Sequence, residues 1–279
     1  MTTLSRRQFM KLLGVGAIAV AGDSFFIEPQ RLTVSRQVLQ SGGGGSGKTV
    51  RFVQFSDLHI SRIGRLEGHL AETIKSIAPD FAVITGDSLN SNNEIGLFSR
   101  FLDSLPAGMS VYAVPGNWEH KGLVDLNRLD EVLRKRNGRL LINETVRLHH
   151  QGIDMLVTGL DDHIMGNPDL ISALKGMTPA PNHLILTHSP GFRRQLQNQL
   201  ARASGFSPQF ILAGHTHGGQ ITLFGFAPYL PVGSGGYKHG WYGGEGPRMF
   251  VSRGVGTTLI PARFMAPPEL VYYEWRLNA

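Results

Sequence analysis

The sequence predicts an α/β fold in which helices flank either one largely parallel or mixed sheet or two stacked sheets. Three observations lead to this prediction. Strand-like and helix-like segments alternate in the first half of the chain, strand-like segments crowd in the second half, and polar clusters directly follow several strands. With 279 residues, the chain is long enough for one large domain with a substantial core.

The first 21 residues are expected to be a signal peptide. Arg6, Arg7 and Lys11 precede an apolar run that ends near an A-x-A-like sequence at residues 19–21. The stretch SRRQFMK at residues 5–11 resembles the twin-arginine export signal, whose pathway moves folded proteins. Because the apolar run has about 10 residues and a membrane span needs about 20, a conventional transmembrane helix is not expected. The alternative is a basic amphipathic helix that rests on a membrane surface.

Composition restricts the kinds of site and partner. The chain has no cysteine, which excludes disulfides, thiolate metal ligands and a cysteine nucleophile. The net charge is +6, but removing the three basic residues of the signal from the 27 leaves 24 against 21 acidic side chains. Since the remainder has no long run of Lys and Arg, nucleic-acid binding is not expected.

Residues 22–49 are expected to form a flexible linker. They contain GGGGSG at residues 42–47 and show no sustained period. The spacing G-x-x-x-x-G-K-T over residues 42–49 also matches a phosphate-binding P-loop. Such a loop follows a strand and opens a helix, whereas this one leads directly into a strand-like segment. The linker is therefore preferred, and residues 50–279 are expected to form the folded domain.

The domain is expected to begin with alternating strands and helices. Residues 50–55 predict a strand, and apolar residues at helical spacing then predict a helix that ends before Pro79. A strand at 81–85, a helix at 95–105, a strand at 111–114 and a helix at 124–136 are expected to follow. Further strands are expected at residues 140–142, 146–148, 153–159, 184–187 and 210–213.

Polar side chains directly follow the predicted strands. Ligands bind α/β sheets beyond the carboxyl ends of their strands, so these side chains are expected to converge. Because alternate residues of an extended segment share a face, each D-x-H or H-x-H pair is expected to point to one side. Glycines at positions 86, 116, 214 and 218 leave room around a compact centre. The side chains in question are Asp57, His59, Asp87, Asn117, His188, His215 and His217.

This ligand set predicts a metal centre. Imidazole, carboxylate and amide groups without a thiolate suit Mn, Fe or Zn. Seven ligands are too many for one tetrahedral ion, but they fit two divalent ions about 3.5–4 Å apart that share a carboxylate.

The ordered motifs DLH, GD, GN, H and GHTHGGQ resemble those of the calcineurin-like metallophosphoesterase superfamily over about residues 51–269. The late stretch SRGVGTTLIPARFMAPPE and the twin-arginine start are most similar to a subfamily of exported bacterial phosphodiesterases, and also resemble the UDP-2,3-diacylglucosamine pyrophosphatase branch. The resemblance implies a two-sheet αββα sandwich. It also implies that Asp57, His59 and His217 bind one ion, that Asn117, His188 and His215 bind the other, and that Asp87 bridges them.

One position departs from the superfamily pattern. Its members have GNH followed by an acid, and that histidine assists the leaving group, whereas this chain reads GNWEH. His120 is therefore expected to act as the general acid, with Asn117 and His215 completing the catalytic set. The alternative is that another group protonates the leaving oxygen and that Trp118 packs against a face of the substrate.

Further substrate contacts are expected from a segment rich in glycine and aromatic residues at 219–248, interpreted as a mobile flap. Tyr237, His239 and Trp241 are the candidates there, and packing against a sheet edge is the alternative. Arg253 is a candidate for steadying the phosphate, although a structural ion pair would explain it equally well.

Together these features predict an exported hydrolase of phosphate esters, and the resemblance favours a phosphodiester or pyrophosphate. A hydroxide between the two ions would attack phosphorus in line, while His215 steadies the developing charge. The expected partners are a small anionic substrate and the twin-arginine export machinery, and the expected location is the periplasm or cell envelope. Two alternatives stay open: a UDP-diacylglucosamine pyrophosphatase of lipid A synthesis at the membrane surface, anchored by the N-terminus, and a non-catalytic scaffold.

Overall fold

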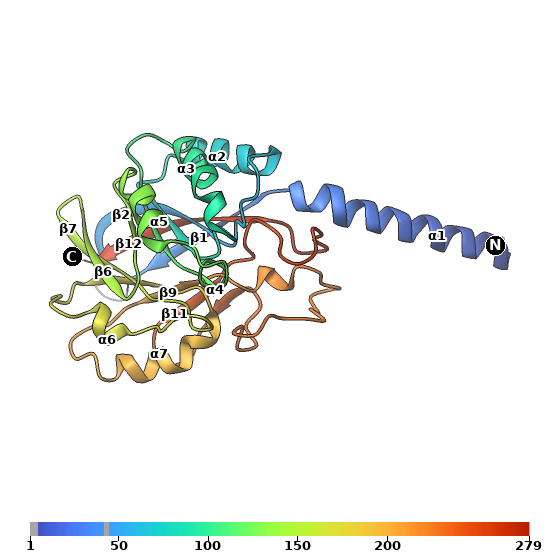
Figure 1. The fold of residues 1–279 in the computed structure, drawn as a ribbon. Helices are drawn as coiled ribbons and strands as arrows, with labels where there is room; N and C mark the ends of the chain where they lie inside the picture. Colours follow the sequence, from blue (N-terminus) through green and yellow to red (C-terminus); the bar gives the residue numbers. More distant parts are fainter. Residues whose placement is uncertain (1–4, 42–44, 279) are drawn as a thin grey trace.

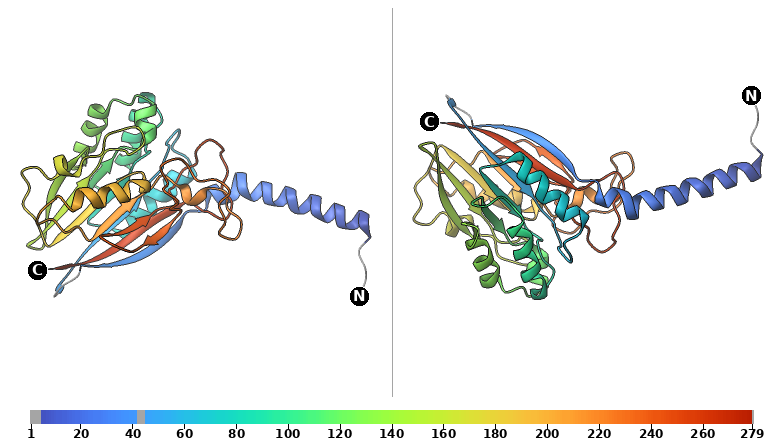
Figure 2. Two further views of the ribbon diagram at one scale, coloured as in Figure 1. Left: turned by 90° about the horizontal axis from the view of Figure 1, so that it is seen from below. Right: turned by 90° about the horizontal axis from the view of Figure 1, so that it is seen from above.

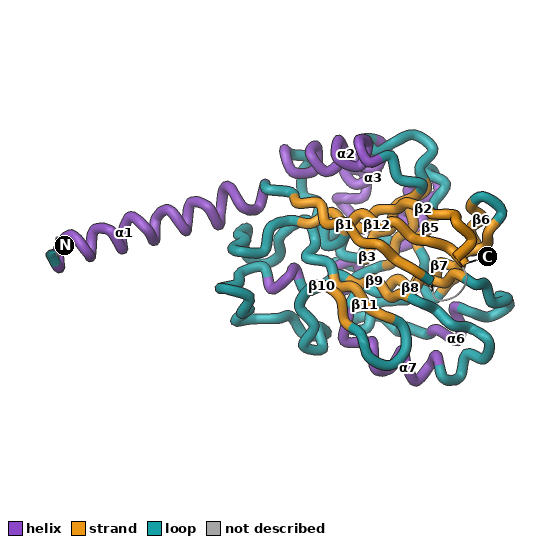
Figure 3. The backbone as a smooth tube through the Cα atoms, turned by 180° about the vertical axis from the view of Figure 1, so that it is seen from behind, coloured by secondary structure: helices purple, strands orange, loops and turns teal. Residues whose placement is uncertain are grey.

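Two six-stranded sheets pack face to face, and helices cover the outer face of each (Figure 1). The structure is a computed structural model that describes residues 5–41 and 45–278. The arrangement confirms the predicted α/β class and the two-sheet αββα sandwich. Figure 3 shows the strands of both sheets as the centre of the domain.

The first sheet is mixed. Its central strands run parallel, and the strand that precedes the C-terminus runs antiparallel beside them. The strand order is β1 (Thr33–Gln40), β12 (Glu269–Asn278), β2 (Gly45–Phe55), β3 (Phe81–Thr85), β4 (Ser110–Val114) and β5 (Arg139–Leu140). Its outer face carries the helices α2 (Arg65–Ile77), α3 (Ile95–Asp103) and α5 (Leu126–Arg134).

The second sheet has four parallel strands with an antiparallel strand at each edge. The strand order is β10 (Gly240–Tyr242), β11 (Arg248–Val251), β9 (Phe210–Ala213), β8 (Asn182–Leu186), β7 (Ile153–Gly159) and β6 (Glu144–His150). The helices α6 (Leu170–Ala173) and α7 (Arg193–Leu200) cover its outer face.

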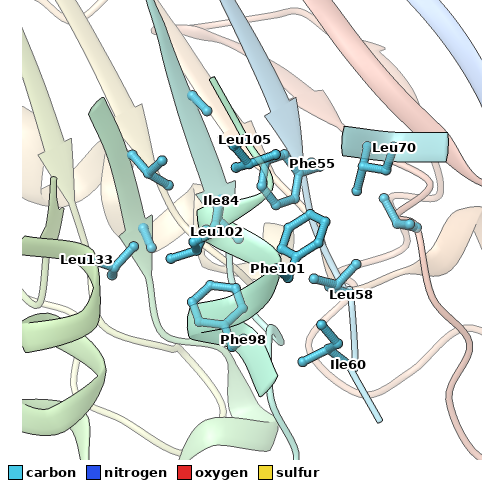
Figure 4. Close-up of a cluster of buried hydrophobic side chains, with 14 of the residues drawn as sticks. Phe55, Leu58, Ile60, Leu70, Ile84, Phe98, Phe101, Leu102, Leu105 and Leu133 are labelled. Carbon is cyan, nitrogen blue, oxygen red and sulfur yellow. The ribbon is translucent and has the colours of Figure 1, made fainter. Parts of the chain in front are cut away.

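The core follows from the alternation of side chains along each strand. On β2, Phe52 points between the sheets, where its ring stacks on Phe81 at 4.9 Å and on Tyr273 at 4.6 Å. Phe55 of the same strand points the other way, into the layer beneath α2 and α3 (Figure 4). Strands buried on both faces therefore carry nearly continuous apolar sequence, which explains why they were predictable.

The predicted elements of the domain are confirmed, and β3, β7 and β9 coincide with their predicted ranges. Several short or late elements were not predicted, because their sequences lack a clear helical or strand period. They are the strands β1, β10, β11 and β12 and the helices α4 (Asn117–Lys121), α6 and α7.

Residues 22–49 are not a flexible linker where the structure describes them. A π-helix (Asp23–Ile27) and a short 3₁₀ helix (Glu28–Gln30) lead into β1, which pairs in parallel with β12. The prediction was wrong because β1 is ordered by hydrogen bonds to a strand that lies far away in the sequence, which no local pattern reveals. Residues 45–49 belong to β2, so this part of the P-loop spacing is strand; residues 42–44 lie outside the described residues.

The N-terminal helix α1 (Arg6–Gly22) projects from the domain, and none of its residues is buried (Figure 2). Ser5 caps it, with the Gln8 side chain completing a capping box. Residues Arg6–Gln30 are long and apolar enough to cross a membrane, and a signal sequence near the N-terminus passes the same test. The helical stretch is longer than the apolar run of about 10 residues, so length does not argue against a membrane span.

Buried hydrogen bonds fix the base of α1 to the domain. Glu28 is 2 % exposed, and its carboxylate accepts from the backbone N–H groups of Met265 (2.9 Å) and Ala266 (2.6 Å). The backbone N–H of Arg263 donates to the carbonyl of Ser24 at 2.9 Å. The segment after α1 and the loop before β12 are therefore one structural unit.

We expect Glu28→Ala to lower the free energy of unfolding by about 2–4 kcal/mol, because one buried and one part-buried backbone N–H group lose their carboxylate acceptor. Urea unfolding followed by tryptophan fluorescence measures this change. The matched control, Glu72→Ala, removes an exposed carboxylate from α2 and should change stability by less than about 0.5 kcal/mol. Equal stability of both variants would contradict the fixed attachment of residues 23–30.

Candidate metal centre

Five loops meet at one end of the sandwich, where parallel strands of both sheets present their carboxyl ends. The loops after β2, β3 and β4 come from the first sheet, and those after β8 and β9 come from the second. This confirms that the polar clusters of the sequence converge. They carry Asp57 and His59, Asp87, Asn117, His188, and His215 and His217, respectively.

A first group of donors consists of Asp57, His59 and His217, whose ligand atoms lie within 4.8 Å of one another. The two Nε2 atoms of His59 and His217 are 3.3 Å apart, and His217 Nε2 lies 3.6 Å from Asp57 Oδ1. All three side chains are buried. The loop after β2 and the loop after β9 thus face each other across the gap between the sheets.

A second group consists of Asp87, His188 and His215, again within 4.8 Å of one another. His188 Nε2 lies at its centre, 3.1 Å from His215 Nδ1 and 3.2 Å from Asp87 Oδ2. Asn117 Oδ1 is 3.1 Å from the same nitrogen. Asp87 Oδ2 also lies 3.7 Å from His59 Nε2, so this carboxylate stands between the two groups.

Hydrogen bonds on the outer side of three imidazoles orient their inner nitrogens. His188 Nδ1 lies 2.8 Å from the carbonyl of Thr85, and His215 Nε2 lies 2.7 Å from that of Val232. Since a carbonyl only accepts, both ring nitrogens are donors, and the opposite nitrogen of each ring faces the centre. His59 Nδ1 makes the equivalent contact with Asn90 Oδ1 at 2.8 Å. Such outer partners are typical of metal-binding histidines.

Burial and close charges shift the acidities of these groups. Burial, assisted by the charge of His188, lowers the pKa of His215 to about 4, so its imidazole is neutral at pH 7. Burial opposes protonation of His188 too, but the Asp87 carboxylate outweighs it and raises the pKa of His188 well above its ordinary value. Burial likewise opposes ionisation of Asp87, and His188 nevertheless holds the pKa of Asp87 below its ordinary value. Both shifts favour the charged form of the pair.

The donor set fits two divalent cations. Buried carboxylate, imidazole and amide groups converge in two groups that share Asp87, and the chain has no thiolate. This chemistry suits Mn, Fe or Zn and gives no reason to choose among them. The residues therefore form two candidate metal sites, as the sequence predicted.

The backbone reaches this arrangement in a way that the sequence argument did not foresee. The D-x-H and H-x-H segments were expected to be extended, but Asp57, His59, His215 and His217 all have positive φ, between 44° and 74°. Asp87 has φ 53°. The chain turns sharply after each strand, into a left-handed region that Asp and His enter more readily than most residues with a side chain.

Close packing around the ligands explains two of the predicted glycines. A Cβ atom at position 86 would lie 2.4 Å from His188 Nδ1, and one at position 116 would lie 2.2 Å from Asp87 Oδ1. Both distances are shorter than any real contact. Glycine is required here because neighbouring loops approach each other through these positions.

Glu119 holds the loops together and was not predicted from the sequence. It is buried, and its carboxylate accepts hydrogen bonds from four backbone N–H groups. Three belong to residues 87–89 after β3, and the fourth belongs to Gly116 after β4. An acid two residues after the ligand Asn117 was the available signal, because an acid near a helix N-terminus accepts backbone N–H groups.

A pocket of about 510 Å³ opens directly over both ligand groups. Asp87, Asn117, His215 and His217 form its floor. Its walls are largely apolar and come from α4 and from the loops at 219–232 and 258–260. Trp118 and Lys121 of α4 line it, and the Lys121 ammonium lies 4.2 Å from the centre of the Trp118 ring.

His120 does not line this pocket. Its Nε2 lies 2.7 Å from Asp161 Oδ1, and this hydrogen bond raises the pKa of His120. Helical geometry separates Trp118 and His120, which are two residues apart on α4, and turns them in different directions. The geometry therefore favours the alternative in which Trp118 faces the substrate.

The other four predicted substrate contacts lie away from the pocket. Trp241 donates to Gln37 and packs on Phe250, at the edge of the second sheet. Tyr237 packs on Tyr242, and Arg253 bonds to Glu269 and Thr33, which is the structural ion pair named as its alternative. His239 is exposed and does not line the pocket either. Only the first part of the expected flap, at 219–232, faces the ligands, because β10 draws residues 240–242 to the sheet.

Known proteins share this sequence pattern. The family model for calcineurin-like phosphoesterases matches residues 50–219. The metallophosphoesterase YkuE of Bacillus subtilis is 29% identical over 98% of this chain and 98% of its own length, and a metallophosphoesterase of Aquifex aeolicus is 26% identical over 89% and 92%. A solved dimetal phosphatase of Danio rerio covers 74% of this chain and 88% of its own, with 14% identity and a TM-score of 0.44. Because the family model spans more than half of the sequence, the chain belongs to the calcineurin-like phosphoesterase family.

Proposed function

We propose that the protein is a hydrolase that uses two divalent cations to cleave phosphodiester or pyrophosphate bonds. The observation that carries this proposal is the position of Asp87, whose Oδ2 lies 3.2 Å from His188 Nε2 and 3.7 Å from His59 Nε2. A carboxylate shared by two donor groups is what a pair of adjacent ions requires. When bound, the cations would lower the pKa of a water molecule and offset the charge of the phosphate.

The residues of the chain position the substrate and the cations. In the hydrolysis, the oxygen of water forms a bond to phosphorus, the bond from phosphorus to the leaving oxygen breaks, and that oxygen takes up a proton. Lys121 places a positive charge at the pocket for an anionic substrate, and Trp118 offers it an apolar face. The apolar walls leave room for the organic substituents of an ester, and we favour a phosphodiester or pyrophosphate over a monoester.

We also propose that the domain acts outside the cytoplasm, in the periplasm or cell envelope, after twin-arginine export. Arg6, Arg7 and Lys11 lie at the start of α1, and basic residues at one end of an apolar helix favour the cytoplasmic side for that end. The domain then lies on the opposite side, which argues against the cytoplasmic lipid pyrophosphatase. The scaffold alternative is disfavoured because all seven candidate ligands are present and converge.

We expect the purified protein, loaded with Mn, Zn or Fe, to hydrolyse bis-p-nitrophenyl phosphate. Asp87→Asn should lower kcat/KM more than about 100-fold, because both ligand groups lose a shared oxygen. Asp103→Asn, an exposed carboxylate at the end of α3, is the matched control and should stay within twofold. Lack of activity with each metal against diesters, monoesters and nucleotide diphosphate esters would favour the scaffold.

His120→Ala is expected to lower turnover by less than about tenfold, because His120 pairs with Asp161 outside the pocket. A general acid matters most for poor leaving groups, so the comparison uses diesters with a p-nitrophenolate and with an alkoxide leaving group. Metal content measured on the same samples controls for loss of ions. A loss of about 10²-fold or more that is confined to the alkoxide would identify His120 as the general acid.

We expect metal to bind more weakly at pH 6 than at pH 8. Asp87 raises the pKa of His188, so His188 carries a proton to higher pH than an ordinary histidine and must release it when a cation binds. As the pH falls below this pKa, affinity should fall by up to about tenfold per unit. Calorimetric titration with Mn²⁺ in buffers of different ionisation enthalpy measures the released protons. Binding without proton release at pH 7 would contradict this charge state.

A further inference from the structure

Large apolar side chains project into solvent from loops that also contribute to the walls of the pocket. They come from the two loops that form its outer walls, after β9 and before β12. We call this set the apolar rim: Leu223, Phe224, Phe226, Tyr229, Val232 and Leu259. Each is more than half exposed. The two loops are joined by a hydrogen bond from the N–H of Thr222 to the carbonyl of Phe264 at 2.8 Å, and exposed apolar side chains gathered on joined loops indicate a contact surface.

The backbone conformation of the apolar rim shows that packing within the domain does not explain why its residues are apolar. Leu223 and Phe226 exchange backbone hydrogen bonds of 2.8 and 2.9 Å across a two-residue turn, Phe224-Gly225. Phe224 has φ 46° and is 87% exposed at the tip of this turn. Such a turn, with positive φ at both central residues, favours Asn-Gly. Leu259 also combines a positive φ (60°) with 79% exposure. Two bulky apolar residues thus occupy strained, solvent-facing positions. At these exposures, their side chains contribute little to the hydrophobic core.

The N-terminal helix α1, which is long and apolar enough to cross a membrane, lies on the same side of the domain as the apolar rim. Helix α1 leaves the domain on the side that carries the orange and red loops at 219–239 and 253–266, and the views agree on this (Figures 1 and 2). Phe26, at its base, is exposed as well. Glu28 and Ser24 fix this base to the loop at 263–266, so the rim and the helix keep one relative orientation.

Charge is arranged to suit an anionic membrane surface. The segments 220–239 and 253–266 contain no Asp or Glu. Of their basic residues, Arg263 is fully buried and Arg253 pairs with Glu269, so Lys238 is the one that offers its charge at the surface. Arg31, which directly follows the helical stretch, is exposed at the level where head groups would begin. Apolar side chains and basic groups without carboxylates are the composition of a surface that rests in the head-group region.

We propose that α1 anchors the chain in a bilayer, that the apolar rim rests in the same bilayer, and that the pocket takes lipid-linked phosphoesters from it. The substrate class is an amphiphile whose phosphate reaches the candidate metal sites while its hydrocarbon part lies along the apolar walls. This deepens, and rests on, the proposed hydrolase activity. This arrangement places the reactive centre at the membrane surface, where it would meet lipid-linked esters in preference to soluble ones.

The position of the rim can be measured independently of activity. Because the chain has no cysteine, Phe224→Cys introduces a unique site for a nitroxide label in the full chain, reconstituted in vesicles of phosphatidylglycerol and phosphatidylethanolamine. The label should collide more with lipid-soluble oxygen than with a water-soluble nickel complex. Val38→Cys is the control, an exposed apolar site (56%) on the edge strand β1, where the order should reverse. A water-exposed label at 224, or one shielded from both reagents by another protein copy, would overturn the proposal.

The substrate class is tested with two esters that share one reactive group. Hexadecyl p-nitrophenyl phosphate in vesicles and ethyl p-nitrophenyl phosphate in solution both release p-nitrophenolate when water attacks phosphorus, leaving the alkyl phosphate. The wild-type holoenzyme should have at least about tenfold higher kcat/KM for the hexadecyl ester. Equal values would overturn the lipid assignment.

A rim variant separates membrane contact from chemistry. Phe224→Asn with Phe226→Ser changes two residues that do not line the pocket, and Asn suits the turn, so the thermal unfolding midpoint should not fall. The preference for the hexadecyl ester should drop about tenfold, while hydrolysis of the ethyl ester stays within twofold. Equal loss on both esters, or no loss, would contradict the proposal. If the wild type cleaves neither ester, the proposed hydrolase fails, and the label measurement still decides the membrane contact.

Discussion

The structure depends on one constraint: two carboxylates and four imidazoles are buried together where the two sheets meet. Burying ionisable groups is costly unless each finds a partner. The pairing of Asp87 with His188 offsets part of this cost, and the lowered pKa of His215 keeps its imidazole neutral at pH 7, which avoids another part. Asp57 remains the least compensated, since burial raises its pKa. The ionised carboxylates of the cluster are therefore not fully compensated by the protein, and two bound cations would supply the missing positive charge.

The backbone around the cluster adopts an unusual conformation because it has to bring these ligands together. The loops place their ligands by left-handed turns rather than by extended strands, and glycines let the loops approach each other. Glu119 offsets the cost of this irregular backbone, because one carboxylate satisfies N–H groups from the loops after β3 and β4. The position of Asp87 is thus set from both sides, by Glu119 at its backbone and by the N–H of Trp118 at its carboxylate.

The sequence revealed what is encoded locally. Apolar runs on strands buried on both faces, followed at once by Asp, Asn or His, were sufficient to predict the parallel strands and the convergence of their ends. Features that arise from distant contacts were not predictable: β1 exists through its pairing with β12, and the ring of Trp241 turns to Gln37 on that edge strand. The orientation of His120 is of the same kind, since it is set by Asp161, 41 positions later in the chain.

The N-terminal helix and the candidate metal centre are connected through a single residue. The backbone N–H of Arg263 donates to Ser24 at the base of the helical stretch, while its side chain, fully buried, donates to the carbonyl of His217 at 3.4 Å. Its guanidinium also binds the carbonyls of Ala266 and Gly256, which fixes the loop between them. A buried planar guanidinium satisfied by several carbonyls is a rigid connector, because shifting it would leave several acceptors unpaired at once. The depth of the ligands relative to the end of the helix is therefore fixed by hydrogen bonds, and an anchored helix would determine how far from the bilayer the phosphate is held.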